Sequence, residues 1–401
     1  MLDLIIAILT GIAIGTFTGI TPGIHINTVT AILLANIGFF SSISSLALVS
    51  FVVALAITHT ILDFIPSILT GATDEESFLS VLPGHEMLKE GKGKEAILMV
   101  LIGAVTAIPL ILAITPIFIK VVPKIFNSIK TIIPFILIFI SLYTVTRERK
   151  VWTAFVVFIS TGLLGFATLN LPVKEPLLPL LAGLFGGSGL IIGISQKIKI
   201  PKQENLKIKD IDFPKKEYMK SVVGSILSAP LCSFLPAIGS GQAATISSEL
   251  ISQSRKGFLM MLGAINIIVM VLSFATLQTI GKTRTGASVA VKQILKTLSA
   301  NNLWTIIFIA IATIIIASIV AIALTNILIK ILEKINYKTI SIIMFTLLTI
   351  SVILISNPLG ILVFIASTAW GIFTILSNVK RINMMGVLLM PTIIIYLTNQ
   401  I

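Results

Sequence analysis

The sequence has few charged residues and almost no cysteine or histidine. Charged side chains make up 11% of its 401 residues, against about 25% in a typical soluble domain. A hydrophobic share of 56% and a mean hydropathy of +1.08 leave too little polar surface for a water-soluble fold of this length. The single cysteine, Cys232, excludes a disulfide framework and a cysteine-based metal site, and the three histidines match no metal-binding spacing. We therefore expect no metal and no cofactor.

Motifs that would supply energy or chemistry are also missing. The glycines and lysines of Gly91–Lys94 lack the spacing of a phosphate-binding loop. No GxSxG elbow and no recognisable Ser/His/Asp set occurs. We therefore expect the chain not to be an enzyme. A membrane-embedded hydrolase using His59 and Asp63 is a weaker alternative, because it lacks a metal set or a second well-placed acid. A further alternative is a structural membrane scaffold, but such a protein would not need helices that are broken at matching places in the two halves.

Long apolar runs fill most of the sequence. A span needs roughly 20 apolar residues, so the chain has room for about 10 to 13 membrane segments. The runs are too long for barrel strands, which indicates an all-α polytopic protein of the cell membrane. Residues 1–4 lack a basic region and a cleavage site, so we interpret the first run as a retained span. The net charge is +13, and the basic residues lie in short loops between apolar runs. This placement favours anionic lipid headgroups, and not nucleic acid, as the partners of the basic residues.

One polar stretch divides the chain into two nearly equal halves. Residues 197–220 contain eight lysines and two prolines, and this lysine excess predicts a cytoplasmic location. A basic linker in the middle of the chain is typical of transporters built from two repeats. We therefore expect a first transmembrane repeat over residues 1–196, a linker over 197–218 and a second repeat over 219–401, with the two repeats inverted relative to each other.

A proline-containing break occurs at a matching place in each half. Pro22-Gly23 follows one apolar run, and Pro236-Ala237 follows another; aligning the prolines places Gly23 on Ala237. Proline removes a backbone hydrogen bond, and a broken helix persists in a membrane only where protein or a water-filled cavity satisfies it. We therefore expect two re-entrant helical hairpins. The alternative is a pair of kinked helices with glycine for close packing.

Half-helices that start at these breaks would point their amide groups and positive dipole ends toward a central anion site. The predicted substrate-binding residues are those at and just after the two breaks: Thr21, Pro22, Gly23, His25, Asn27, Thr28, Pro236, Gly239, Ser240, Gly241, Gln242 and Thr245.

Four ionisable residues extend this prediction. His59 and Asp63 are four residues apart inside an apolar run, so they share one helix face and are candidates for coupling transport to H⁺ or Na⁺. The alternative is a structural pair packed into the helix bundle. Lys282 and Arg284 follow a later apolar run without a neighbouring acid, and are candidate contacts for a carboxylate or phosphate.

These motifs carry a resemblance. The run Gly15–Gly23, Gly-Thr-Phe-Thr-Gly-Ile-Thr-Pro-Gly, resembles the signature that opens the large membrane permease subunit of the tripartite tricarboxylate transporters, the TctA family. Residues 67–97 are similar to the family's next block, and Pro236–Gly239 resembles its second proline motif. Clear similarity covers about a quarter of the chain. The chain looks shorter than the bacterial permeases and lacks their long Glu-Ala-Ala-Asn-Asn-like stretch, so the resemblance implies a divergent prokaryotic or archaeal-type member.

The resemblance implies a secondary transporter of a small anionic, carboxylate-type substrate. It also implies an extracytoplasmic binding protein or a small membrane subunit as partner, although one chain shows neither. The chain also resembles, more faintly, the membrane proteins that recycle polyprenyl phosphate. Those proteins likewise contain two helical hairpins that are broken at Pro-Gly. The alternative function is therefore a lipid-phosphate translocase of the membrane.

Overall fold

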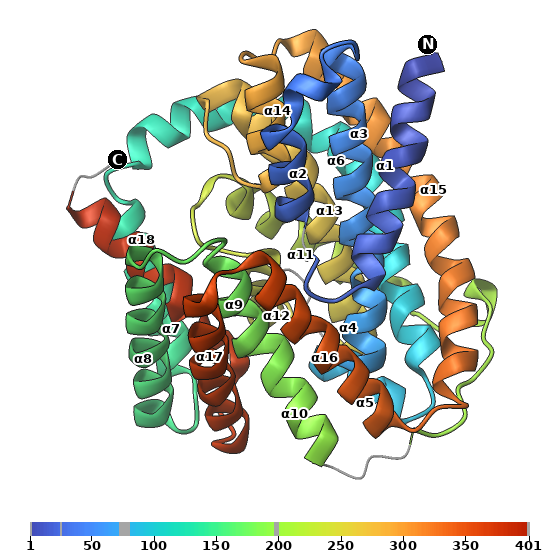
Figure 1. Cartoon of the computed structure of the whole chain (residues 1–401), viewed down its shortest axis with the longest axis vertical. Helices are drawn as coiled ribbons and strands as arrows, with labels where there is room; N and C mark the ends of the chain where they lie inside the picture. Colours follow the sequence, from blue (N-terminus) through green and yellow to red (C-terminus); the bar gives the residue numbers. More distant parts are fainter. Residues whose placement is uncertain (1, 25, 72–80, 196–199, 399–401) are drawn as a thin grey trace.

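The computed structural model describes residues 2–24, 26–71, 81–195 and 200–398, and within these ranges every regular element is a helix (Figure 1). Nine helices of the described ranges are long and apolar enough to cross a membrane. The all-helical, polytopic fold expected from the apolar runs is therefore confirmed.

Ten α-helices and two short turns form the described part of the first half. In chain order they are α1 (Leu2–Ile20), α2 (Ile26–Ala35), the 3-10 turn η1 (Ile37–Phe40), α3 (Ser45–Leu62), α4 (Phe64–Thr70), α5 (Val81–Lys89), α6 (Gly93–Ile129), α7 (Ile133–Thr146), α8 (Val151–Asn170), α9 (Leu177–Leu181), the π-helical turn η2 (Ala182–Gly187) and α10 (Ser188–Ser195).

Eight α-helices follow in the second half. They are α11 (Lys215–Phe234), α12 (Ser240–Leu250), α13 (Arg255–Ile280), α14 (Gly286–Leu295), α15 (Ala300–Leu332), α16 (Tyr337–Ile355), α17 (Pro358–Leu376) and α18 (Gly386–Leu397), with the 3-10 turns η3 (Ile208–Asp210) before α11 and η4 (Arg381–Met385) before α18. Because α11 begins at Lys215, residues 215–218 of the expected linker are helical.

The helices break at both prolines. The first break separates α1 from α2, and Gly23 lies in it with φ +86°. The second separates α11 from α12, and Ala237, the residue aligned with Gly23, has φ +57°. A left-handed residue one position after a proline reverses the chain direction that a continuous helix would keep. An alanine rarely adopts this conformation, so the surrounding contacts hold it there.

The helices gather in two groups (Figure 1). One contains α1–α6 and α11–α15; α1 packs on α3, α11 on α13, α3 on α15 and α6 on α13. The other contains α7–α10 and α16–α18; α8 packs on α18, and α17 packs on the turn η2. In Figure 1 the first group holds the right and upper parts of the molecule, and α7, α8 and α17 lie at the lower left.

Small residues bring these helices into close contact. Gly11, Gly15 and Gly19 recur every four residues on α1, and a Cβ atom at any of them would lie 2.6 to 2.8 Å from an atom of α3. On α6 and α13, a Cβ atom at Gly103 or at Gly263 would overlap the backbone of the opposite helix. Because lipid provides no hydrophobic driving force between helices, such close backbone packing is a main source of their association.

Candidate functional site

A cavity of about 290 Å³ lies between the two groups of helices. The first group supplies its lining from α2, the second break, α12, α13 and α14, and the second group supplies residues of α9 and α18. The lining residues are Ile26, Asn27, Leu177, Ala237, Gly239, Ser240, Val269, Met270, Arg284, Thr285, Gly286, Leu388 and Thr392. The start of α2, which follows the first break, and the second break thus meet at one cavity.

Three helices begin at this cavity. Ile26 and Asn27 start α2, Ser240 starts α12 after the cap residue Gly239, and Gly286 starts α14 after the cap residue Thr285. The first amides of a helix have no acceptor within the helix, and the helix dipole places partial positive charge there. The convergence of three such ends makes the cavity attractive to an anion.

Arg284 is the one charged side chain among the described residues of the lining. It follows Gly281, which ends α13 with φ +69°, and a guanidinium N–H donates to the carbonyl of Ile238 in the second break. Its buried Nε–H has no hydrogen-bond partner among the residues that the structure describes. The arginine therefore fixes the backbone of the break and keeps a donor for a further group.

Two small polar side chains share the lining with Arg284. Ser240 is 3% exposed, and within the described ranges its buried hydroxyl has no hydrogen-bond partner, although a buried hydroxyl normally has one. Asn27 packs directly on Gly286, where a Cβ atom would overlap the amide oxygen of Asn27. The start of α2 is thereby held against the start of α14.

The structure brings Asn27, Gly239, Ser240 and Arg284 together at the cavity, and the other predicted residues are not among its described lining. Thr21, Pro22 and Gly23 form the first break, where Gly23 packs against Ser351 of α16. Gln242 accepts a hydrogen bond from the amide of Gly239 at 2.9 Å.

The remaining predicted residues lie elsewhere or outside the description. Pro236 belongs to the second break and Gly241 is buried in the first turn of α12. Thr245 lines a separate small hollow beside Glu249 and Lys380. Lys282 is exposed, with its ammonium group 5.8 Å from the centre of the Phe126 ring. His25 and the side chain of Thr28 lie outside what the structure describes.

His59 and Asp63 are both buried, and they lie away from the described lining of the cavity. The His59 ring nitrogen Nδ1 is 3.0 Å from the hydroxyl oxygen of Thr18 on α1. Asp63 stands between α3 and α4, where its backbone amide donates to the carbonyl of His59 at 2.9 Å. Their coupling role therefore stays a prediction.

Sequence reasoning missed the third helix start and the apolar walls. Thr285 caps α14 by accepting from the amide of Ser288 at 3.2 Å, and this Thr-x-x-Ser spacing was a readable signal for a helix start. The walls from α9, α13 and α18 had no such signal, because their leucine, valine and methionine residues resemble any other apolar residue of a membrane helix.

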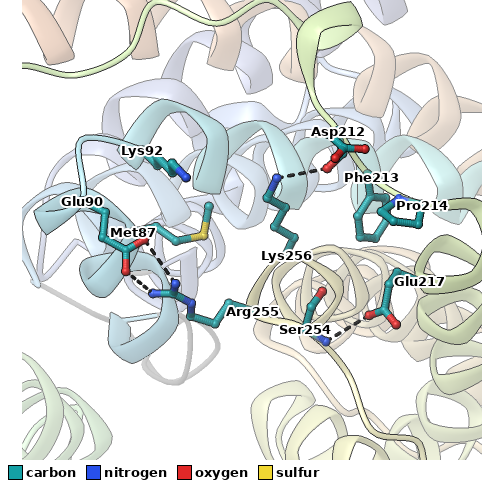
Figure 2. Close-up of a pocket in the computed structure, with 10 residues that line it drawn as sticks. All are labelled: Met87, Glu90, Lys92, Asp212, Phe213, Pro214, Glu217, Ser254, Arg255 and Lys256. Carbon is teal, nitrogen blue, oxygen red and sulfur yellow. Dashed lines mark hydrogen bonds and ion pairs between the residues drawn. The ribbon is translucent and has the colours of Figure 1, made fainter.

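A second cavity of about 320 Å³ lies where the linker meets the starts of α11 and α13 (Figure 2). Arg255 binds Glu90 through two hydrogen bonds of 2.8 and 3.2 Å, and the ammonium group of Lys256 donates to the backbone carbonyl of Asp212 at 3.0 Å. The amide of Ser254 donates to Glu217 at 3.0 Å. We interpret these contacts as structural: they hold the linker against the second half and the first half against the second.

A hydrogen-bonded cluster joins the two halves near the end of α4. The Tyr337 hydroxyl lies 3.0 Å from the Thr70 carbonyl and 3.1 Å from Nε2 of His85, and Nδ1 of His85 lies 3.3 Å from the Ile68 carbonyl. Burial lowers the pKa of His85 from 6.5 to about 4. The ring is therefore neutral at pH 7 and carries one N–H, which donates either from Nδ1 to the Ile68 carbonyl or from Nε2 to the Tyr337 hydroxyl, whose own proton is donated to the Thr70 carbonyl.

This pKa predicts an acid-sensitive stability. Between pH 6.5 and about 4 the unfolded chain binds a proton at His85 that the folded chain does not, so stability falls as the pH falls through this window. We expect the unfolding temperature of the wild type to drop more steeply from pH 7 to 4.5 than that of His85→Gln, whose amide hydrogen-bonds without titrating. Parallel curves for the two proteins would show that His85 does not protonate on unfolding.

The fold and the cavity define a polytopic, all-helical membrane protein with an anion-attracting cavity between two groups of helices. A comparison with known families matches residues 5–386 to the tripartite tricarboxylate transporter TctA family, so the chain belongs to that family. It is also 32% identical to an uncharacterized protein of Methanocaldococcus jannaschii, over 99% of this chain and the whole of that protein. No solved structure matches. The resemblance seen at the Gly15–Gly23 motif is therefore confirmed.

Proposed function

We propose that this protein is a secondary active transporter that moves a small anionic substrate of the carboxylate type through the cavity between its two groups of helices. Membership of the TctA family makes it a membrane protein of a transporter family. The observation that carries the proposal is the meeting of three helix starts and Arg284 at one cavity. Partial positive charge and a guanidinium donor together favour a carboxylate over a neutral or cationic ligand.

Two inverted repeats with re-entrant hairpins are part of this proposal. Its support is the shared order of elements: each half has a long helix, a break, a short helix, a long span that ends at a left-handed glycine, and another short helix before a long one. The packing is also reciprocal, because α3 contacts α15 while α13 contacts α6. In transporters of this kind, substrates bind near the midplane, where such repeats meet.

The site's place between the two groups suggests how access would alternate. Residues of α9 and α18 close the cavity on one side, and α2, α12 and α14 close it on the other. Movement of one group against the other would open the cavity to either face of the membrane while the binding residues of each group stay in place. A binding protein or a small membrane subunit, as the word tripartite in the family name implies, would deliver the substrate.

Uptake into liposomes tests the proposal. The purified protein is reconstituted, and uptake of labelled mono-, di- and tricarboxylates is measured under imposed H⁺ and Na⁺ gradients. We expect one gradient to drive accumulation of at least one carboxylate. If neither gradient drives accumulation of any of these anions, and a cationic or neutral solute is carried instead, the proposal is wrong.

We further propose that His59 and Asp63 link this transport to the driving ion. An ionisable pair buried within a membrane span is costly, and such pairs often line an ion pathway. We expect Asp63→Asn to keep substrate binding but to lose gradient-driven accumulation, and His59→Gln to flatten the pH dependence of uptake. If accumulation and its pH profile are unchanged in both variants, His59 and Asp63 do not couple transport and have only a structural role.

A further inference from the structure

The cavity has one strong cationic contact. Among the described lining residues Arg284 alone carries a charge, and it takes part in no ion pair. Its Nη2 group donates to the Ile238 carbonyl and lies 3.6 Å from Sγ of Cys232, while its Nε–H has no partner in the described part of the chain. The guanidinium can therefore neutralise one carboxylate of a ligand, next to the unpartnered hydroxyl of Ser240.

The walls from α9, α13 and α18 are mostly apolar, whereas Asn27 and Thr285 add polar groups near the helix starts. The residues that α9, α13 and α18 contribute are Leu177, Val269, Met270 and Leu388, with Thr392 as the one polar exception. A second ligand carboxylate placed among these side chains would lose its water and find no cation. A buried charge without a partner is strongly unfavourable, whereas an apolar chain would fit such a wall well.

We propose, building on the function proposed above, that the preferred substrate carries one negative charge and an apolar portion, in contrast to the tricarboxylates for which the family is named. Its carboxylate binds Arg284, Ser240 and the nearby helix starts, and its apolar portion packs on the walls from α9, α13 and α18. The cavity of about 290 Å³ suits a short chain, since ligand pockets commonly range from about 300 to 1,000 Å³.

Matched six-carbon probes test this inference. Binding of hexanoate, adipate, hexanol and citrate to the purified full-length protein is measured by calorimetry at pH 7.5. Hexanoate and adipate differ in one terminal group, so their ratio isolates the second charge. We expect adipate, citrate and hexanol each to bind roughly tenfold or more weakly than hexanoate. Adipate or citrate binding as tightly as hexanoate would overturn the inference and leave anion transport standing. If no acid binds, this inference fails, whereas the transport proposal is decided by the uptake measurements above.

A variant that supplies the missing cation sharpens the test. Thr392→Lys places a second positive charge in the otherwise apolar part of the lining, and Thr392→Gln is the uncharged control. We expect the lysine variant to raise the affinity for adipate relative to hexanoate by roughly tenfold, and the glutamine variant to leave the ratio unchanged. If a folded lysine variant has the same ratio of adipate to hexanoate affinity as wild type, the far end of the ligand does not lie against the wall from α18, and the inference is wrong. The wild-type comparison stands even if this variant fails to fold.

Discussion

Replacing Arg284 by glutamine is expected to abolish substrate binding. Removing one partner of a buried, hydrogen-bonded charge pair costs about 2–5 kcal/mol, which is roughly a 30-fold or larger loss of affinity. Arg284 would form such a pair with the substrate carboxylate, because its buried Nε–H has no other partner among the described residues. Arg284→Lys keeps the charge but loses the planar fork of donors, so we expect it to restore only part of the affinity. The measurements are binding by calorimetry and uptake into liposomes.

A matched control lies two residues away. Lys282→Gln removes the same charge from the same loop, but the Lys282 side chain is exposed and lies over the Phe126 ring, outside the cavity lining. We expect its affinity to stay within about twofold of wild type, since an exposed charge contributes little. Because Arg284 also donates to Ile238, the unfolding temperature of each variant is recorded. Equal effects of the two substitutions, or normal binding by a folded Arg284→Gln, would remove Arg284 from the site.

Replacing Gly239 by leucine is expected to block transport while the protein stays folded. A Cβ atom at Gly239 would meet no atom within 4 Å, and its φ of −76° suits any residue. The leucine side chain would therefore enter the cavity and take the space of the substrate. Losing glycine as helix cap costs up to about 1 kcal/mol, a small destabilisation. We expect uptake to fall more than about tenfold, with an unfolding temperature close to that of wild type.

Gly23 gives a contrasting result. It has φ +86°, and a Cβ atom there would lie 2.9 Å from the Cβ atom of Ser351. We therefore expect Gly23→Leu to lower the unfolding temperature as well as uptake, because its backbone and its packing are both disturbed. If Gly239→Leu transports normally, the cavity is not on the substrate's path.

Much of the fold follows from local features of the sequence. Long apolar runs predict helices, and the prolines at 22 and 236 predict where two helices break, because proline acts on its own backbone. The same local reasoning places Asn27 and Ser240 in the first turns after the breaks, where the structure has them. The alignment of Gly23 with Ala237 also pairs two residues that share a left-handed backbone.

What a residue faces depends on packing between distant segments, which local patterns do not encode. Lys282 and Arg284 carry the same charge and lie two residues apart in one loop, yet Lys282 is exposed and Arg284 lines the cavity. Helical spacing places His59 and Asp63 on one face, but it does not reveal that Thr18 of α1 is the neighbour of His59. The walls from α9 and α18 come from residues more than 50 positions away from both breaks.

The central claim is that the substrate binds in the cavity where the helices α2, α12 and α14 begin. The most direct test places a single cysteine at Ser240 in a Cys232→Ser background, since Cys232 is the one native cysteine. The rate at which a small anionic thiol reagent modifies this cysteine is then measured with and without a saturating concentration of the anion that drives uptake. The account predicts that the reagent reacts and that the transported anion slows the reaction severalfold. An identical rate with and without the anion would contradict it.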